Sequence, residues 1–156
     1  MIGALLLRAS FPRFCKAVSS KDVEGVCAAV AEDAVFEFPG RSNISGRYEG
    51  REAIRGFWMR IFERYETFTM TPKRVGLTRP YAVGLTNSVL MEWLVDATTQ
   101  DGLELHAQGV AAVEIRRGKM VHSRDYFFDP TLLEPIWGTR TKESQRSSTT
   151  GTTQPA

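Results

Sequence analysis

The strongest constraint on this chain is a change in its hydrophobic period near residue 66. Upstream, apolar residues recur at helical spacing, most clearly over residues 51–65, where the large apolar side chains share one face. Downstream, the pattern is typical of extended segments, and the predicted strands cover residues 66–75, 82–97, 103–115 and 120–128. Helices followed by a run of long strands predict an α+β domain, because a parallel sheet requires helices and strands to alternate.

The segment before residue 66 is predicted to hold two further helices and one short strand. Apolar spacing predicts helices over residues 11–18 and 23–30, and Asp22 is a suitable N-cap for the second. Residues 33–40 alternate as a strand that a Pro-Gly pair ends, and residues 41–50 are predicted to form a polar loop.

The length of 156 residues fits a single domain, which we place over residues 1–137. Within it, the apolar segment 132–137 is predicted to form a short flap at the end of the last strand. Residues 138–156 are rich in serine and threonine and contain almost no apolar side chains. They cannot bury enough apolar surface to offset the entropy of ordering, so we expect a disordered tail.

Composition argues against several kinds of partner. The net charge is only +2 and basic residues are scattered among acidic ones, so we expect no nucleic-acid surface. No apolar run approaches the roughly 18 residues of a membrane span. Cys15 and Cys27 are predicted to be buried thiols in a reducing compartment, so we expect a cytoplasmic protein. Neither they nor His106 and His122 have metal-ligand spacing, and we expect no bound metal.

Three segments carry a family resemblance: Asp33–Glu37, Gly46–Arg55 and Gly118–Phe127. Together they resemble the SnoaL-like branch of the nuclear-transport-factor-two-like (NTF2-like) superfamily, over roughly residues 11–129. The resemblance implies a cone in which a curved mixed/antiparallel sheet wraps on N-terminal helices and encloses an apolar pocket. That superfamily includes polyketide cyclases, ketosteroid isomerases, limonene epoxide hydrolases and plain binding modules, so the fold alone does not assign a reaction.

The segment Arg124–Asp129 is similar to the last strand of the limonene epoxide hydrolases, which carries a pocket aspartate. This similarity implies that Asp125 is an acid–base carboxylate. The preceding long strand departs from that family, since Glu92 stands where it has an arginine and Leu94 where it has a second aspartate.

Phenylalanines and alanine occupy other positions at which relatives have polar groups. Phe36 and Phe38 stand where the epoxide hydrolases hold the attacking water with a tyrosine and an asparagine. In the ketosteroid isomerases, the general base corresponds to Phe38, and the oxyanion-binding tyrosine and aspartate correspond to Phe14 and Ala111. A histidine of the SnoaL cyclases also corresponds to Ala111. Asp125 is the acid that every comparison retains.

Alternation along a strand predicts which side chains share a face. Asp125 shares its face with Ser123, and we expect Glu92 on the same pocket side of the sheet. Trp93 and Val95 would then lie on the outer face. Superfamily members commonly form homodimers through this face, so we expect a homodimer there.

These residues predict an acid–base enzyme that needs no cofactor and acts on a small hydrophobic molecule, such as a polyketide, terpenoid or steroid-like ring. Asp125 would move the proton with help from Glu92. Epoxide opening ranks first among the reactions, because of the run Arg124–Phe127, and cyclisation or isomerisation ranks next. The predicted substrate pocket consists of Phe14, Phe36, Phe38, Trp58, Phe62, Leu94 and Ala111.

Simpler interpretations remain open for both acids. Asp125 could end its strand in a salt link to Arg124, and Glu92 could pair with a nearby arginine on a solvated face. His106 and His122 have the opposite alternation and are predicted to be sheet-face histidines. The alternative function is a non-catalytic module that binds a hydrophobic ligand or a second chain. An enzyme requires Asp125 to be buried and unpaired, whereas a binding module would hold it in a salt bridge or in water.

Overall fold

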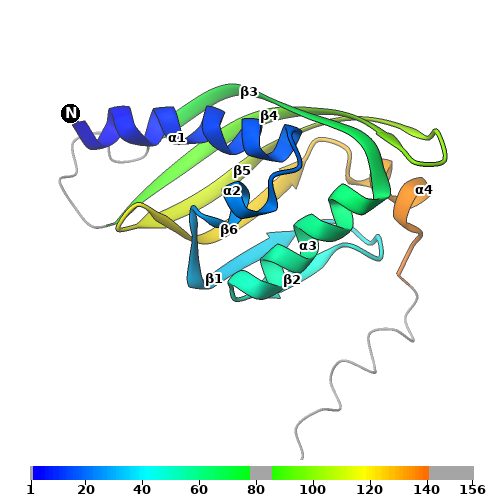
Figure 1. The fold of residues 1–156 in the computed structure, drawn as a ribbon, viewed down its shortest axis with the longest axis horizontal. Helices are drawn as coiled ribbons and strands as arrows, with labels where there is room; N and C mark the ends of the chain where they lie inside the picture. Colours follow the sequence, from blue (N-terminus) through cyan, green and yellow to red (C-terminus); the bar gives the residue numbers. More distant parts are fainter. Residues whose placement is uncertain (1, 78–85, 141–156) are drawn as a thin grey trace, which may run out of the picture.

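The computed structural model describes residues 2–77 and 86–140, with the side chains of residues 2–9 and 86 excepted. Helices come first and long strands follow (Figure 1). The elements are α1 (Ile2–Ser19), α2 (Val23–Cys27), β1 (Val30–Phe38), β2 (Gly46–Glu49), α3 (Arg51–Arg64), β3 (Tyr65–Leu77), β4 (Thr86–Thr99), β5 (Glu104–Arg116), β6 (Lys119–Phe127), η1 (Pro130–Leu133) and α4 (Glu134–Trp137).

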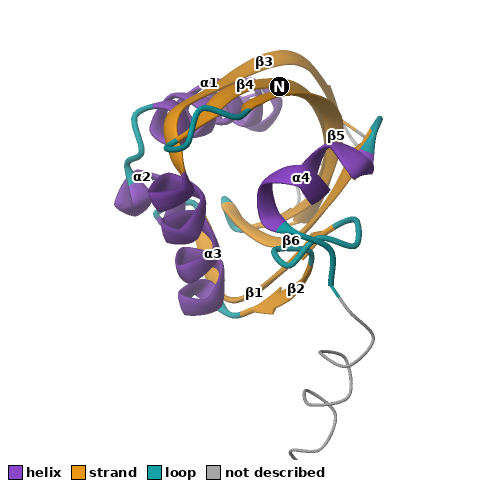
Figure 2. Cartoon of the chain, turned by 90° about the vertical axis from the view of Figure 1, so that its right-hand side faces the viewer, coloured by secondary structure: helices purple, strands orange, loops and turns teal. Residues whose placement is uncertain are grey.

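One mixed sheet of six strands forms the body of the molecule, in the order β2-β1-β6-β5-β4-β3. Neighbouring strands are antiparallel except β1 and β6, which run parallel. Pairing shifts register within β3/β4, β5/β6 and β1/β6, and such irregularities bend a strand and increase its twist. The sheet therefore curls into an open cone (Figure 2). The α+β fold predicted from the sequence is confirmed.

Helices α1, α2 and α3 pack on the concave side of this sheet (Figures 1 and 2). The helical spacing in α3 has its predicted consequence, since Ile54, Phe57, Trp58 and Ile61 are all buried. Asp22 caps α2 by accepting a hydrogen bond from the Gly25 amide at 2.9 Å, as predicted. The core therefore lies between the helices and the inner face of the sheet.

Three elements differ from those predicted. Helix α1 begins at Ile2, well before its predicted start at residue 11. Helix α2 ends at Cys27, because Val30 already pairs with Met120 and begins β1. The segment predicted as a loop contains β2, which pairs with β1. Tyr48 holds this strand in place. Its ring centroid lies 5.0 Å from that of Phe57, and its hydroxyl donates a hydrogen bond to the Ile44 carbonyl oxygen at 2.6 Å.

The end of the described chain closes one side of the cone. Residues 132–137, predicted to form a flap, lie in η1 and α4, where Leu133 and Ile136 are buried. The predicted tail begins at residue 138, but Thr139 still pairs with Ser42, so the ordered chain extends beyond the predicted boundary. Residues 141–156, the rest of that tail, lie outside the described residues. In the part of the chain that the structure describes, no helix is both long and apolar enough to cross a bilayer.

Candidate active site

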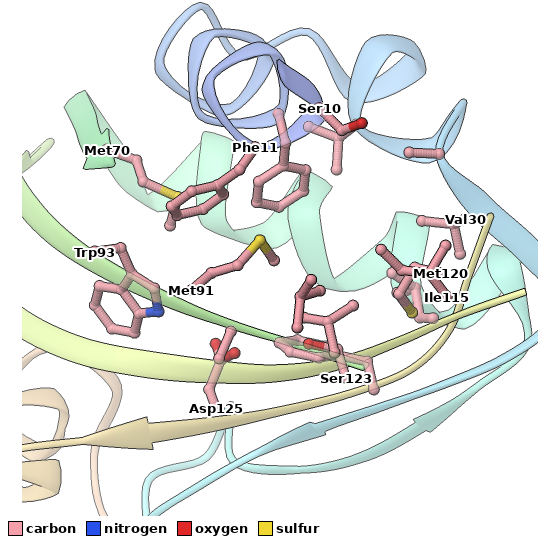
Figure 3. A pocket seen from close by; sticks show the side chains of 18 of the residues that line it. Ser10, Phe11, Val30, Met70, Met91, Trp93, Ile115, Met120, Ser123 and Asp125 are labelled. Carbon is pink, nitrogen blue, oxygen red and sulfur yellow. The ribbon is translucent and has the colours of Figure 1, made fainter. Parts of the chain in front are cut away.

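A cavity of about 150 Å³ lies between the helices and the inner face of the sheet (Figure 3). Side chains from α1, α2, α3 and five strands line it, and most of them are apolar. Apart from the indoles of Trp58 and Trp93, the described lining contains three polar side chains, those of Ser10, Ser123 and Asp125. Any ligand of this cavity therefore meets mainly hydrocarbon and aromatic surface.

Asp125 lies on β6 and faces this cavity from the inner side of the sheet, in register with Ala111 on β5. It retains partial exposure, but apolar side chains crowd its carboxyl group, which makes no hydrogen bond or ion pair with the described residues. Burial raises the pKa of Asp125 to about 7, because an apolar environment penalises the ionised form. The carboxyl can therefore both donate and accept a proton at neutral pH.

The salt link considered for Asp125 does not form. Arg124 points to the opposite face of β6, where its guanidinium hydrogen-bonds to Glu37 on β1. Neighbouring residues on a strand alternate between faces, so the residue beside Asp125 in the sequence cannot reach its carboxyl. Asp125 thus faces a pocket and has no arginine partner among the described residues, but it is only partly buried, and its catalytic role stays a prediction.

A second, smaller cavity of about 40 Å³ adjoins the first. Trp58, Met70, Trp93 and Asp125 line both cavities, so the carboxyl lies where the two meet. The remaining described lining of the smaller cavity is apolar apart from the phenol of Tyr65. A ligand in the larger cavity can therefore extend an apolar group past Asp125 only into a narrow space.

Five of the predicted pocket residues do line these cavities. Phe14, Phe36 and Ala111 line the larger one, Phe38 lines the smaller one, and Trp58 lines both. Their rings pack on one another, for example Phe14 on Trp58 with ring centroids 5.8 Å apart. The walls predicted from the sequence are therefore largely those of the structure.

The predicted pocket positions of Glu92, Leu94 and Phe62 are wrong. Glu92 lies on the outer face, where its carboxylate is 3.6 Å from the guanidinium of Arg74, which is the solvated pairing considered as its alternative. Leu94 shares that outer face by alternation. Phe62 lines neither cavity and packs at the edge of the core, with its ring centroid 5.8 Å from that of Trp58.

The missed residues come from the other face of the same strand. Met91 and Trp93 line the larger cavity, and Trp93 and Val95 are buried, not exposed on the outer face as predicted. The clue was present in β4, whose odd-numbered positions from Val89 to Ala97 are all apolar, whereas Glu92 and Asp96 interrupt the even-numbered ones. The homodimer stays a prediction, without the two residues on which it was based.

The remaining titratable groups do not join Asp125. His106 is exposed on the sheet, with Nδ1 at 2.8 Å from a carboxylate oxygen of Asp96, as expected of a sheet-face histidine. His122 lies on the outer side of the sheet, where its Nε2 is 3.5 Å from a carboxylate oxygen of Glu37. Within residues 2–77 and 86–140, no group of three or more histidine, cysteine or acidic side chains could hold a metal ion.

Comparison with known proteins agrees with this geometry. The SnoaL-like domain model matches residues 11–123, and the chain belongs to this family. The fold is shared with an NTF2-like protein of Burkholderia pseudomallei, which superposes with a TM-score of 0.68 at 16% identity, over 83% of this chain and 95% of that one.

One curated relative has no described function, whereas two similar structures carry functional descriptions. The uncharacterized protein YesE of Bacillus subtilis (strain 168) is 29% identical over 133 residues, which cover 81% of this chain and 83% of YesE. A Bacillus subtilis structure described as a "putative isomerase" is 26% identical, with a TM-score of 0.67, over 85% of this chain and 93% of that one. An LEH-like epoxide hydrolase of M. tuberculosis is 23% identical, with a TM-score of 0.62, over 82% of this chain and 86% of that one.

Proposed function

We propose that this protein is an acid–base enzyme that moves a proton within a small, largely apolar molecule, with Asp125 as the catalytic group. One observation carries the proposal: a carboxyl that has no partner among the described residues faces an apolar cavity, and burial raises its pKa to about 7. At neutral pH such a group exists in both protonation states, so it can take a proton at one position and return it at another.

Within this class, the cavity favours isomerisation or cyclisation over the addition of water. A hydrolase must hold its attacking water with about two to four polar partners. Phe36 and Phe38 offer none, and Glu92 lies on the outer face. The description of the similar Bacillus subtilis structure as a "putative isomerase" agrees with this preference.

The simplest balanced reaction is a shift of a double bond in an unsaturated ketone. The Asp125 carboxylate removes a proton from the carbon next to the carbonyl and leaves an enolate. The resulting carboxylic acid returns the proton to a carbon further along the conjugated system. No atom is gained or lost, and Asp125 ends in its starting state.

The test uses cyclic β,γ-unsaturated ketones as probes, since their conjugated products absorb strongly in the ultraviolet. Asp125→Asn should lower kcat by about 10²- to 10⁴-fold, the usual contribution of a general acid–base group. Glu92→Gln is the matched control, because it neutralises a carboxyl on the outer face of the same sheet, and it should leave kcat unchanged. A terpene epoxide assayed in parallel tests for hydrolysis.

Two results would count against the proposal. Full turnover by a folded Asp125→Asn protein would remove Asp125 from the chemistry. Tight binding of the whole probe panel without any conversion would instead favour the alternative, a module that binds hydrophobic ligands in the same cavity.

A further inference from the structure

A second polar group lies close to Asp125 on the same strand. Ser123 precedes it by two residues on β6, so both side chains point to the inner face of the sheet. Both line the larger cavity (Figure 3). Two steps along a strand separate their Cα atoms by about 7 Å.

The hydroxyl of Ser123 has no hydrogen-bond partner among the side chains and backbone groups that the structure describes. The residue is 7% exposed, and no described residue forms a hydrogen bond with its side chain. Its register partners on the neighbouring strands are Phe36 on β1 and Val113 on β5, both apolar. The hydroxyl oxygen is not one of the fully buried, unpartnered atoms of the described residues, so it opens on the cavity, where a polar atom of a ligand can reach it. Alanine would therefore cost the fold little at this position.

We infer that Ser123 is a specificity-determining residue whose hydroxyl binds a second polar atom of the ligand. This inference rests on the proposed function and names its substrate class. The ligand is an elongated apolar molecule with two oxygens on the order of 7 Å apart, one meeting Asp125 and the other Ser123. A hydrocarbon with a single functional group would leave the Ser123 hydroxyl unpaired, which disfavours its binding.

The first test needs no ligand. If the hydroxyl of Ser123 has no structural partner, Ser123→Ala should unfold at the same temperature as the parent or at a higher one. Thermal unfolding followed by circular dichroism measures this. A drop of several degrees would mean that the hydroxyl stabilises the fold, and it would overturn the inference.

The second test compares three probes that share one ring system. Naphthalen-2-ol has one hydroxyl, naphthalene-2,6-diol has hydroxyls at opposite ends, and naphthalene-2,3-diol has them on adjacent carbons. Calorimetry or quenching of tryptophan fluorescence gives each Kd. The 2,6-diol should bind the parent about 3- to 10-fold more tightly than the mono-ol, the usual worth of one hydrogen bond. Ser123→Ala should abolish this gain, and the 2,3-diol should show none in either protein.

Val113→Ala is the matched control, since it removes apolar atoms beside Ser123 and should weaken all three probes alike. A gain that survives in Ser123→Ala, or an equal gain with the 2,3-diol, would overturn the inference. Failure of every probe to bind at millimolar concentration would overturn it together with the apolar substrate class.

The two proposals can fail separately. If Ser123→Ala has no effect on diol binding while Asp125→Asn abolishes isomerisation, only the role of Ser123 falls. If diol binding depends on Ser123 while Asp125→Asn keeps full turnover, the catalytic proposal falls and the cavity remains a selective binding site.

Discussion

The two faces of the sheet treat a carboxyl group in opposite ways. Glu37 on β1 is in register with Arg124 on β6, the residue directly before Asp125, yet Glu37 and Asp125 point to opposite faces. On the outer face, the hydrogen bond from Arg124 lowers the pKa of Glu37 to about 2, and Arg47 adds a second ion pair at 2.8 Å. On the inner face, burial raises the pKa of Asp125 to about 7.

The difference shows that the face of the sheet on which a carboxyl lies, and not the residue type, decides in which direction its pKa shifts. The outer face is solvent-exposed and rich in arginine, so its carboxylates form surface ion pairs. The inner face is apolar, so its carboxyl is held near the point where it changes charge. Acid–base chemistry is therefore confined to one side of the sheet.

The largest expected effect concerns the cost of the charge at Asp125. Because the pKa of the folded state lies above the unfolded value near 3.8, the associated stability is complete below about pH 3.8. It is lost as pH rises through about 7. Asp125→Asn, which never ionises, should therefore be more stable than the parent at pH 8.5, by about 1 to 4 kcal/mol.

Urea unfolding at pH 3 and at pH 8.5 measures this difference in the free energy of unfolding. Near pH 3 the two proteins should be almost equal, because Asp125 is then largely protonated in both the folded and the unfolded state. If the difference in free energy of unfolding between the parent and Asp125→Asn were the same at both pH values, the inner face would not penalise the charge.

A smaller effect is expected from filling the inner face at Gly109. A Cβ at this position would lie 2.6 Å from the ring of Trp93 and 2.5 Å from the Tyr126 carbonyl oxygen. Gly109→Ala should therefore lower the free energy of unfolding by about 1 to 3 kcal/mol and displace Trp93 from the cavity wall. Urea unfolding measures the first change, and tryptophan fluorescence reports the second.

Gly56→Ala serves as the control for that substitution. A Cβ at Gly56, inside α3, would meet no atom within 4 Å, so the protein should gain about 0.5 to 1 kcal/mol of stability from the better helix former. Equal behaviour of the two alanine variants would show that the contact between Gly109 and Trp93 is not tight.

The smallest effect is expected from Glu37→Gln on the outer face, because exposed ion pairs contribute little. The sign is opposite to that for Asp125. Since the folded pKa of Glu37 is lowered to about 2, its contribution is present above the unfolded value of 4.5 and is lost as pH falls through about 2. Glu37→Gln should be less stable than the parent at pH 7 and equal to it near pH 2, by urea unfolding. A variant more stable than the parent at pH 7 would contradict this.

Much of the fold was predictable because the long elements carry strong periodic signals. Helix α3 and the strands β3 to β6 lie within a few residues of their predicted bounds. The short strand β2 was missed, since four residues carry too little alternation to predict a strand. Its pairing with β1 and the contacts of Tyr48 depend on segments distant in the fold.

The candidate site was predictable in part. Asp125 and the aromatic wall could be found by resemblance and alternation, since Phe36 and Asp125 lie on strands with a clear pattern. Glu92 was assigned to the wrong face, because a register carried over from relatives outweighed the apolar alternation of β4 itself. Trp93, which lines both cavities, was therefore missed.

The sequence by itself determined the order of the elements, their amphipathic faces and the presence of an acid among apolar residues near the end of the last strand. These are local properties, set by side-chain period and turn chemistry. Only the tertiary structure decided that Arg124 pairs with Glu37 and leaves Asp125 without an arginine partner among the described residues. Such pairings depend on which strands become neighbours when the sheet curls, and no local pattern encodes that.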